Sequence, residues 1–92
     1  MRLVFLNGWA ASSAMLDSFK SQLPASYDLI ILDDLYQFEL AEIVTKIDEL
    51  MTADTVLVGW SLGGMLALYY ASLRSGKHQA PVFWKDLIIQ KV

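Results

Sequence analysis

The stretch Val58-Gly59-Trp60-Ser61-Leu62-Gly63-Gly64, written VGWSLGG at residues 58–64, decides the fold of this chain. A short apolar run ends where it begins, and a longer apolar run with helical character follows it. Ser61 therefore has three interpretations: a nucleophile, an N-terminal helix cap, or one polar residue inside a membrane span. The rest of the sequence has to separate them.

The membrane interpretation rests on residues 55–73, which carry no charged side chain and approach the roughly twenty residues that span a bilayer. Gly59 and Gly63 also have the small-xxx-small spacing of membrane helix pairs. However, glycines gather around Ser61 in the middle of this run and weaken a continuous helix. No basic cluster flanks either end. The sequence therefore argues against a membrane span at residues 55–73.

The composition limits the classes of function. The chain has 92 residues, enough for one small domain, and 55% of them are hydrophobic, so much of it is buried or belongs to something larger. A net charge of −3 argues against a nucleic-acid surface. The absence of cysteine excludes disulfides and zinc-thiolate sites. With no signal-peptide core after Arg2, we expect a cytoplasmic protein.

Apolar runs alternate with helical patterns along the chain. The order predicts a parallel sheet of three to four strands with helices on both faces and strand order second-first-third-fourth. The expected strands are residues 3–6, 27–32, 55–58 and, less regularly, 86–89, and the expected helices are residues 12–23, 40–51 and 62–75.

Ser61 falls between the third expected strand and the helix after it, at the sheet edge where α/β proteins carry their functional groups. The Gly-x-Ser-x-Gly spacing suits a sharp strand-to-helix turn that exposes a nucleophilic serine, because side chains at the flanking positions would collide with backbone. The backbone N–H of Leu62 is then a candidate oxyanion donor. Trp9, which follows the first strand, is the candidate for a second donor N–H. The alternative is that Ser61 only caps the helix.

Two motifs carry a family resemblance that covers roughly residues 3–75. LNGWA at residues 6–10 resembles the oxyanion loop of α/β-hydrolases, and GWSLGG at residues 59–64 resembles their nucleophile elbow. The chain is particularly similar to esterases that cleave pimeloyl-acyl carrier protein methyl ester in biotin synthesis. The resemblance implies that residues 1–76 form the N-terminal half of a three-layer α/β-hydrolase domain. Residues 77–92 are expected to be an irregular tail with at most one edge strand.

The resemblance also implies a reaction and its site. Ser61 would be the nucleophile of a carboxylic-ester hydrolase, with the N–H groups of Trp9 and Leu62 binding the oxyanion. Trp9, Trp60 and Met65 would line an apolar substrate pocket. The expected ligand is a small acyl ester or an ester bound to acyl carrier protein, and no cofactor or metal ion is expected.

The chain departs from the family pattern at three places. Asn7 stands where most members have His, and Asp33-Asp34 follows the second strand where many have a Pro-Gly-x-Gly turn. The triad order is Ser, then Asp or Glu, then His, yet the one histidine, His78, follows soon after the elbow helix, and Asp86 lies towards the far sheet edge. We read both as non-catalytic.

From these departures we expect a truncated or frameshifted chain that lacks the triad Asp and His and is inactive alone. The alternative is a catalytically inactive α/β protein that serves as a small binding or interaction module. In either case the last strand would leave one sheet edge exposed, and we expect the chain to self-associate through that edge.

Overall fold

The computed structural model describes residues 1–7, 17–18, 20–32, 35–52, 54–74, 82–84 and 87–91. Five strands, two α-helices and one 3-10 helix are defined within these ranges. In chain order they are β1 (Arg2–Leu6), β2 (Asp28–Leu32), η1 (Leu35–Gln37), α2 (Leu40–Leu50), β3 (Thr55–Trp60), α3 (Leu62–Leu73), β4 (Val82–Trp84) and β5 (Leu87–Lys91). Residues 17, 18, 20 and 21 are also helical and fall within the first expected helix.

The sheet is built around β1, with strand order β2-β1-β3-β5-β4. β1 pairs in parallel with both β2 and β3, so that Leu6 lies between Leu32 and Gly59. The parallel three-strand core and its order are therefore confirmed. β3 also continues two residues beyond its expected end, through Gly59 and Trp60.

The last part of the sheet differs from the expectation. The strand expected near residues 86–89 does lie beside β3, but β5 runs antiparallel to it, with Trp60 opposite Leu87. A further strand, β4, pairs antiparallel with β5. Two residues separate β4 from β5, so the chain doubles back as a hairpin, whereas a parallel crossover needs a dozen or more residues. Residues 77–92 thus supply two strands instead of at most one.

This hairpin also changes the expected edges of the sheet. Within the part of the chain that the structure describes, the outer strands are β2 and the three-residue β4, and β3 is covered. Short edge strands are poor templates for further pairing. Self-association stays a prediction, and β2 is now the longer outer strand that it would use.

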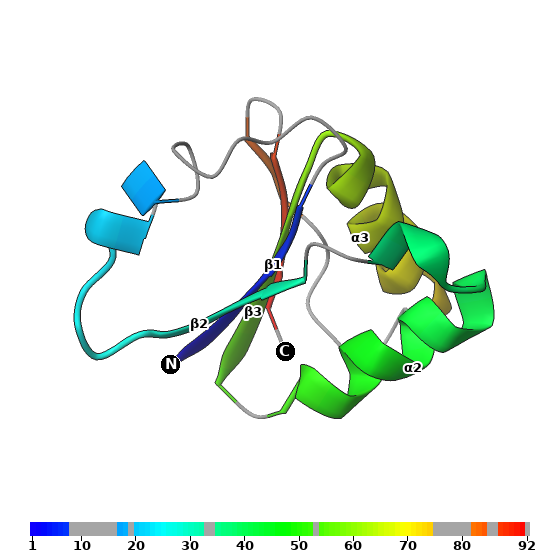
Figure 1. Ribbon diagram of the computed structural model, residues 1–92, viewed down its shortest axis with the longest axis horizontal. Helices are drawn as coiled ribbons and strands as arrows, with labels where there is room; N and C mark the ends of the chain where they lie inside the picture. Colours follow the sequence, from blue (N-terminus) through cyan, green and yellow to red (C-terminus); the bar gives the residue numbers. More distant parts are fainter. Residues whose placement is uncertain are drawn as a thin grey trace.

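Helices lie on both faces of the sheet. Figure 1 shows α2 and α3 together on one side and the short helical segment near residue 20 on the other. On that second face Leu3, Phe5 and Val58 are buried, and Leu23, from the chain after the helical segment, packs against them. The alternation of side chains along β1 and β3 sends neighbouring residues to opposite faces, which is why one apolar run fills both layers.

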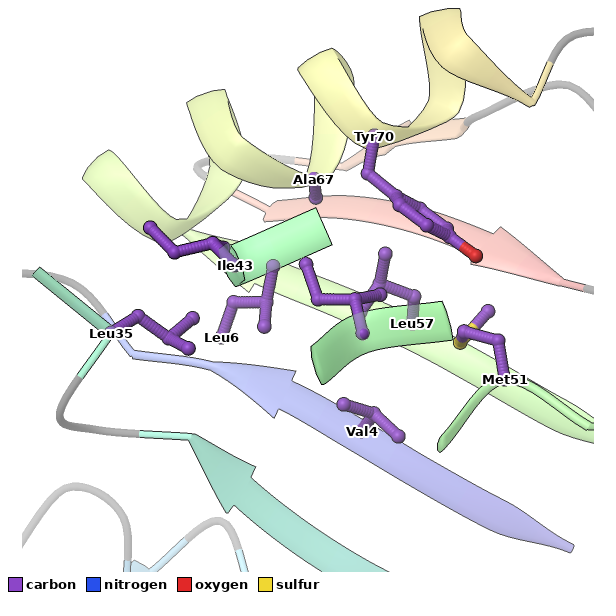
Figure 2. Packing of buried hydrophobic residues seen from close by; sticks show 9 residues of the cluster. Val4, Leu6, Leu35, Ile43, Met51, Leu57, Ala67 and Tyr70 are labelled. Atoms are coloured by element: carbon purple, nitrogen blue, oxygen red, sulfur yellow. The ribbon is translucent and has the colours of Figure 1, made fainter. Parts of the chain in front are cut away.

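The larger core lies between the sheet and the two long helices. Figure 2 shows side chains from β1 and β3 meeting those of α2 and α3. α2 contributes one apolar stripe to this core, with charged residues on the other side, as its helical periodicity predicts. The buried members of the cluster are Val4, Leu6, Leu35, Ile43, Ile47, Met51, Leu57, Ala67 and Tyr70.

A polar cluster joins α2 to α3 at the rim of this core. The Tyr70 ring is buried, and its hydroxyl donates a 2.6 Å hydrogen bond to Asp48 Oδ1. Arg74 pairs with both carboxylate oxygens of Asp48, through Nε at 3.0 Å and through Nη2. Burial and the Asp48 carboxylate raise the pKa of Tyr70. The cluster lies at the end of α3 opposite Ser61 and fastens the two helices together.

None of the helices in the described ranges has the length and apolar character needed to cross a bilayer. The apolar run at residues 55–73 is divided between β3 and α3, with Ser61 at the junction.

Candidate active site

The candidate site lies at the sheet edge where β1 and β3 end. Because Leu6 pairs with Gly59, the residues that follow each strand leave the sheet side by side. α3 begins at this edge, directly after Ser61. The antiparallel β5 starts here too, with Leu87 opposite Trp60. The fold therefore brings Ser61, the N-terminus of α3 and Asn7, the residue after β1, to the same edge of the sheet.

The backbone of Ser61 has an uncommon conformation, with φ 58° and ψ −121°. A non-glycine residue with positive φ is strained, by about 1–3 kcal/mol outside the usual regions, and such strain gathers at functional sites. The Ser61 carbonyl accepts the N–H groups of Gly64 and Met65 at 2.9 and 3.3 Å, which closes the first turn of α3.

The Ser61 side chain makes no capping hydrogen bond to the described helix. The residue stands at the N-cap position, but its hydroxyl does not have the role that explains why serine is favoured there. The side chain is exposed. Its exposure and its strained backbone are the features that a cap alone would not require.

Two glycines make this tight turn possible. A Cβ added to Gly63 would lie 2.7 Å from the carbonyl carbon of Leu6 and closer still to its oxygen. A Cβ on Gly59 would lie 2.7 Å from the carbonyl carbon of Gly63 and 2.8 Å from Ala67 Cβ. Real Cβ atoms essentially never approach other atoms within 3.0 Å. The start of α3 thus rests directly on the backbone of β1 and β3.

We expect Ser61→Gly to stabilise the fold. Relief of the strained backbone should raise the free energy of unfolding by about 1–3 kcal/mol. The greater freedom of glycine in the unfolded chain should lower it by about 0.5–1 kcal/mol. The expected net gain is about 1 kcal/mol in the free energy of unfolding, measured by urea denaturation. Ser72→Gly, in the last turn of α3, is the matched control and should lose stability, because it also removes the hydrogen bond from the Ser72 hydroxyl to the Tyr69 carbonyl. A loss at both positions would contradict the strain at Ser61.

The other expected site residues are placed as follows. Leu62 is the first residue of α3, and Met65, one turn later, is 68% exposed. Trp60 is partly buried and packs against the cluster of Leu3, Phe5 and Val58. Trp9, Asp33, Asp34, His78 and Asp86 lie outside the described residues.

A pair of residues that the sequence did not single out as site residues completes this edge. The Tyr36 hydroxyl, from η1, donates a 2.5 Å hydrogen bond to the backbone carbonyl of Asn7. Asn7 is only 8% exposed, and its Oδ1 has no hydrogen-bond partner within the described ranges. Burial raises the pKa of the Tyr36 phenol, so the hydroxyl stays neutral and able to donate.

Comparison with known proteins agrees with the fold. The family described as alpha/beta hydrolase fold matches residues 2–82, and the chain belongs to that family.

Among curated proteins, it is 29% identical over 84 residues to a pimeloyl-[acyl-carrier protein] methyl ester esterase of Neisseria meningitidis, and 31% identical over 85 residues to that of another strain. It is 39% identical over 75 residues to the biotin biosynthesis bifunctional protein BioHC of Saccharophagus degradans.

These alignments cover most of this chain but a small part of each relative. They include 83% of the chain for the two Neisseria proteins and 68% for the Saccharophagus protein. The chain spans 33% of the length of the Neisseria esterases and 12% of the bifunctional protein. No solved structure matches the chain significantly.

Proposed function

We propose that these residues form the nucleophile and oxyanion-binding part of a carboxylic-ester hydrolase. The observation that carries the proposal is the Ser61 backbone, which has a positive φ at a strand-to-helix turn whose two flanking glycines leave no room for a side chain. This is the arrangement in which α/β-hydrolases expose a catalytic serine. Membership of that family supports the same assignment.

In this proposal Ser61 Oγ attacks the ester carbonyl carbon and gives up its proton to a base. The carbonyl oxygen becomes an oxyanion, bound by the backbone N–H groups of Leu62 and Trp9. The alcohol then leaves and an acyl-serine remains, which water hydrolyses to the acid. The N-terminus of α3 adds a favourable field for the negative charge.

We propose that the general base is not His78. α3 has 12 residues and is about 18 Å long, and it starts directly after Ser61. His78 is four residues beyond Arg74, a distance of at most about 14 Å even for a fully extended chain. His78 would reach Ser61 only if that segment ran back straight along the helix. A polypeptide of these 92 residues is therefore expected to turn over esters very slowly on its own.

For the substrate, we propose an acyl ester of the kind named for the relatives, a pimeloyl-acyl carrier protein methyl ester. Trp9, Trp60 and Met65 would give the apolar wall that an acyl chain needs. Because Met65 is largely exposed, other atoms would have to close such a pocket over it. By the same analogy we propose a cytoplasmic location.

The test is acetylation of individual serines in the purified 92-residue chain. The chain is incubated with p-nitrophenyl acetate and imidazole, which supplies the missing base, and peptides are mapped by mass spectrometry. We expect Ser61 to be acetylated at least ~10-fold faster than Ser72, because one oxyanion donor alone is worth about 10²-fold. The adduct should accumulate, since its hydrolysis also needs a base.

Two variants complete this experiment. His78→Ala, measured without imidazole, should leave the slow residual acetylation of Ser61 unchanged, and Ser61→Ala should remove the labelled peptide without raising label elsewhere. If Ser61 reacts no faster than Ser72, the nucleophile assignment fails and a non-catalytic binding module becomes the better description. If His78→Ala abolishes the reaction, the base lies within these residues.

A further inference from the structure

The backbone of Asn7, the residue that follows β1, is held from three directions. The N–H of Asn7 donates to the carbonyl of Leu32 at 3.2 Å, which extends the pairing of β1 with β2 by one residue. The Asn7 carbonyl accepts the Tyr36 hydroxyl at 2.5 Å. On the helix side it lies beside Gly63, where an added Cβ would come within 3.0 Å of that same oxygen.

We propose that Tyr36 is a positioning residue for the oxyanion site, acting through the carbonyl of Asn7. The inference rests on the proposed function, because it concerns the N–H of Trp9 as an oxyanion donor. The Asn7 carbonyl belongs to the planar peptide that joins Asn7 to Gly8, and the Trp9 N–H belongs to the next peptide. Fixing the first plane leaves only the two dihedral angles of Gly8 between it and the donor.

Those two angles belong to a glycine, the residue with the widest conformational freedom. The hydrogen bond from Tyr36 to the Asn7 carbonyl, immediately before Gly8, therefore restricts the backbone next to its most flexible residue. Conformational freedom there would otherwise move the Trp9 N–H away from the position that an oxyanion donor needs. Oxyanion donors act only when they are held about 2.7–3.1 Å from the developing charge before the reaction starts.

Tyr36 is suited to this task by its place in the fold. It lies in η1, close after the end of β2, so its hydroxyl reaches a strand end that is 29 residues away in sequence. The preceding residue, Leu35, is fully buried in the main core, which fixes the backbone of η1. The position of the Tyr36 hydroxyl is thus fixed by the packing of Leu35 in the core, and the hydrogen bond in turn fixes the Asn7 carbonyl at the edge of the sheet.

The test compares two tyrosines that each lose only a hydroxyl. Tyr36→Phe should slow the acetylation of Ser61 by about tenfold, a partial loss of one donor, and should shift the amide resonance of Trp9 in a two-dimensional NMR spectrum. Tyr70→Phe, which breaks the hydrogen bond to Asp48 at the other end of α3, is the matched control. It should lower the free energy of unfolding and leave both the acetylation rate and the Trp9 amide unchanged.

The outcomes separate positioning from general stability. If Tyr36→Phe slows acetylation only as far as Tyr70→Phe does, or leaves the Trp9 amide where it was, Tyr36 is structural and the proposal is wrong. If wild-type Ser61 shows no selective acetylation, the proposed function fails first, and the Trp9 amide alone then decides whether Tyr36 orders this loop. Tyr36→Ala should match Tyr36→Phe in rate while losing more stability.

Discussion

Gly63→Ala is expected to destabilise the fold by about 3 kcal/mol, a large share of the roughly 5–14 kcal/mol available to a domain of this size. The added methyl group would overlap sterically with the backbone carbonyl of Leu6. That group belongs to the backbone of β1, the second strand in the sheet order and hydrogen-bonded on both sides, so it cannot move aside as a flexible side chain would. α3 would have to move away from the sheet instead, and the buried contacts of Ala67 and Tyr70 would be weakened.

The measurement is urea denaturation followed by circular dichroism, with Met65→Ala as the control in the same helical turn. Met65 is 68% exposed, so its truncation should change the free energy of unfolding by less than about 0.5 kcal/mol. A loss below about 1 kcal/mol for Gly63→Ala would show that α3 does not rest on β1 as described. Since alanine favours helices over glycine, any loss would occur against the intrinsic propensity.

Leu57→Ala is expected to lose about 2–5 kcal/mol, because the Leu57 side chain is fully buried between the sheet and the two long helices. Removing it leaves a cavity that neighbouring strands on both sides cannot close, since β3 is paired with β1 and β5. Figure 2 shows Leu57 among the core side chains that lie below α3.

Leu68→Ala is the matched leucine truncation. Leu68 lies on α3 but is 42% exposed, so the expected loss is under about 1 kcal/mol, although the whole helix is apolar. Leu57→Met, which keeps the volume, should lose less than about 1.5 kcal/mol. Equal losses for the two alanine variants would mean that the buried face of the sheet has been assigned wrongly.

The sequence was sufficient for the parallel core because its strands are continuous apolar runs and its helices have a regular period. It was insufficient for β5, since an apolar strand reads the same in either direction and only its connection fixes the direction. That connection is the two residues Lys85-Asp86, which lack the Asn-Gly or Asp-Gly pattern that marks a tight hairpin. The Val82–Trp84 strand was missed for the same reason.

The candidate site shows the same division. Ser61, Gly59 and Gly63 form a local pattern, and such a pattern is visible in sequence because its members act within one turn of chain. The hydrogen bond from Tyr36 to Asn7 joins two loops that meet only when β1 and β2 pair. No spacing rule connects them, so a contact of this kind can be found only from the folded structure.

The placement of β1 between β2 and β3 has a consequence for how the molecule is made. Arg2 pairs with Thr55, so β1 is synthesised about fifty residues before its partner strand β3. Until then its apolar residues Leu3 to Leu6 have at most one neighbouring strand, and the nascent protein stays open to chaperones and proteases. A single cut in the loop between α2 and β3 would likewise leave neither fragment with the whole core, because β1 and α2 would be separated from β3 and α3.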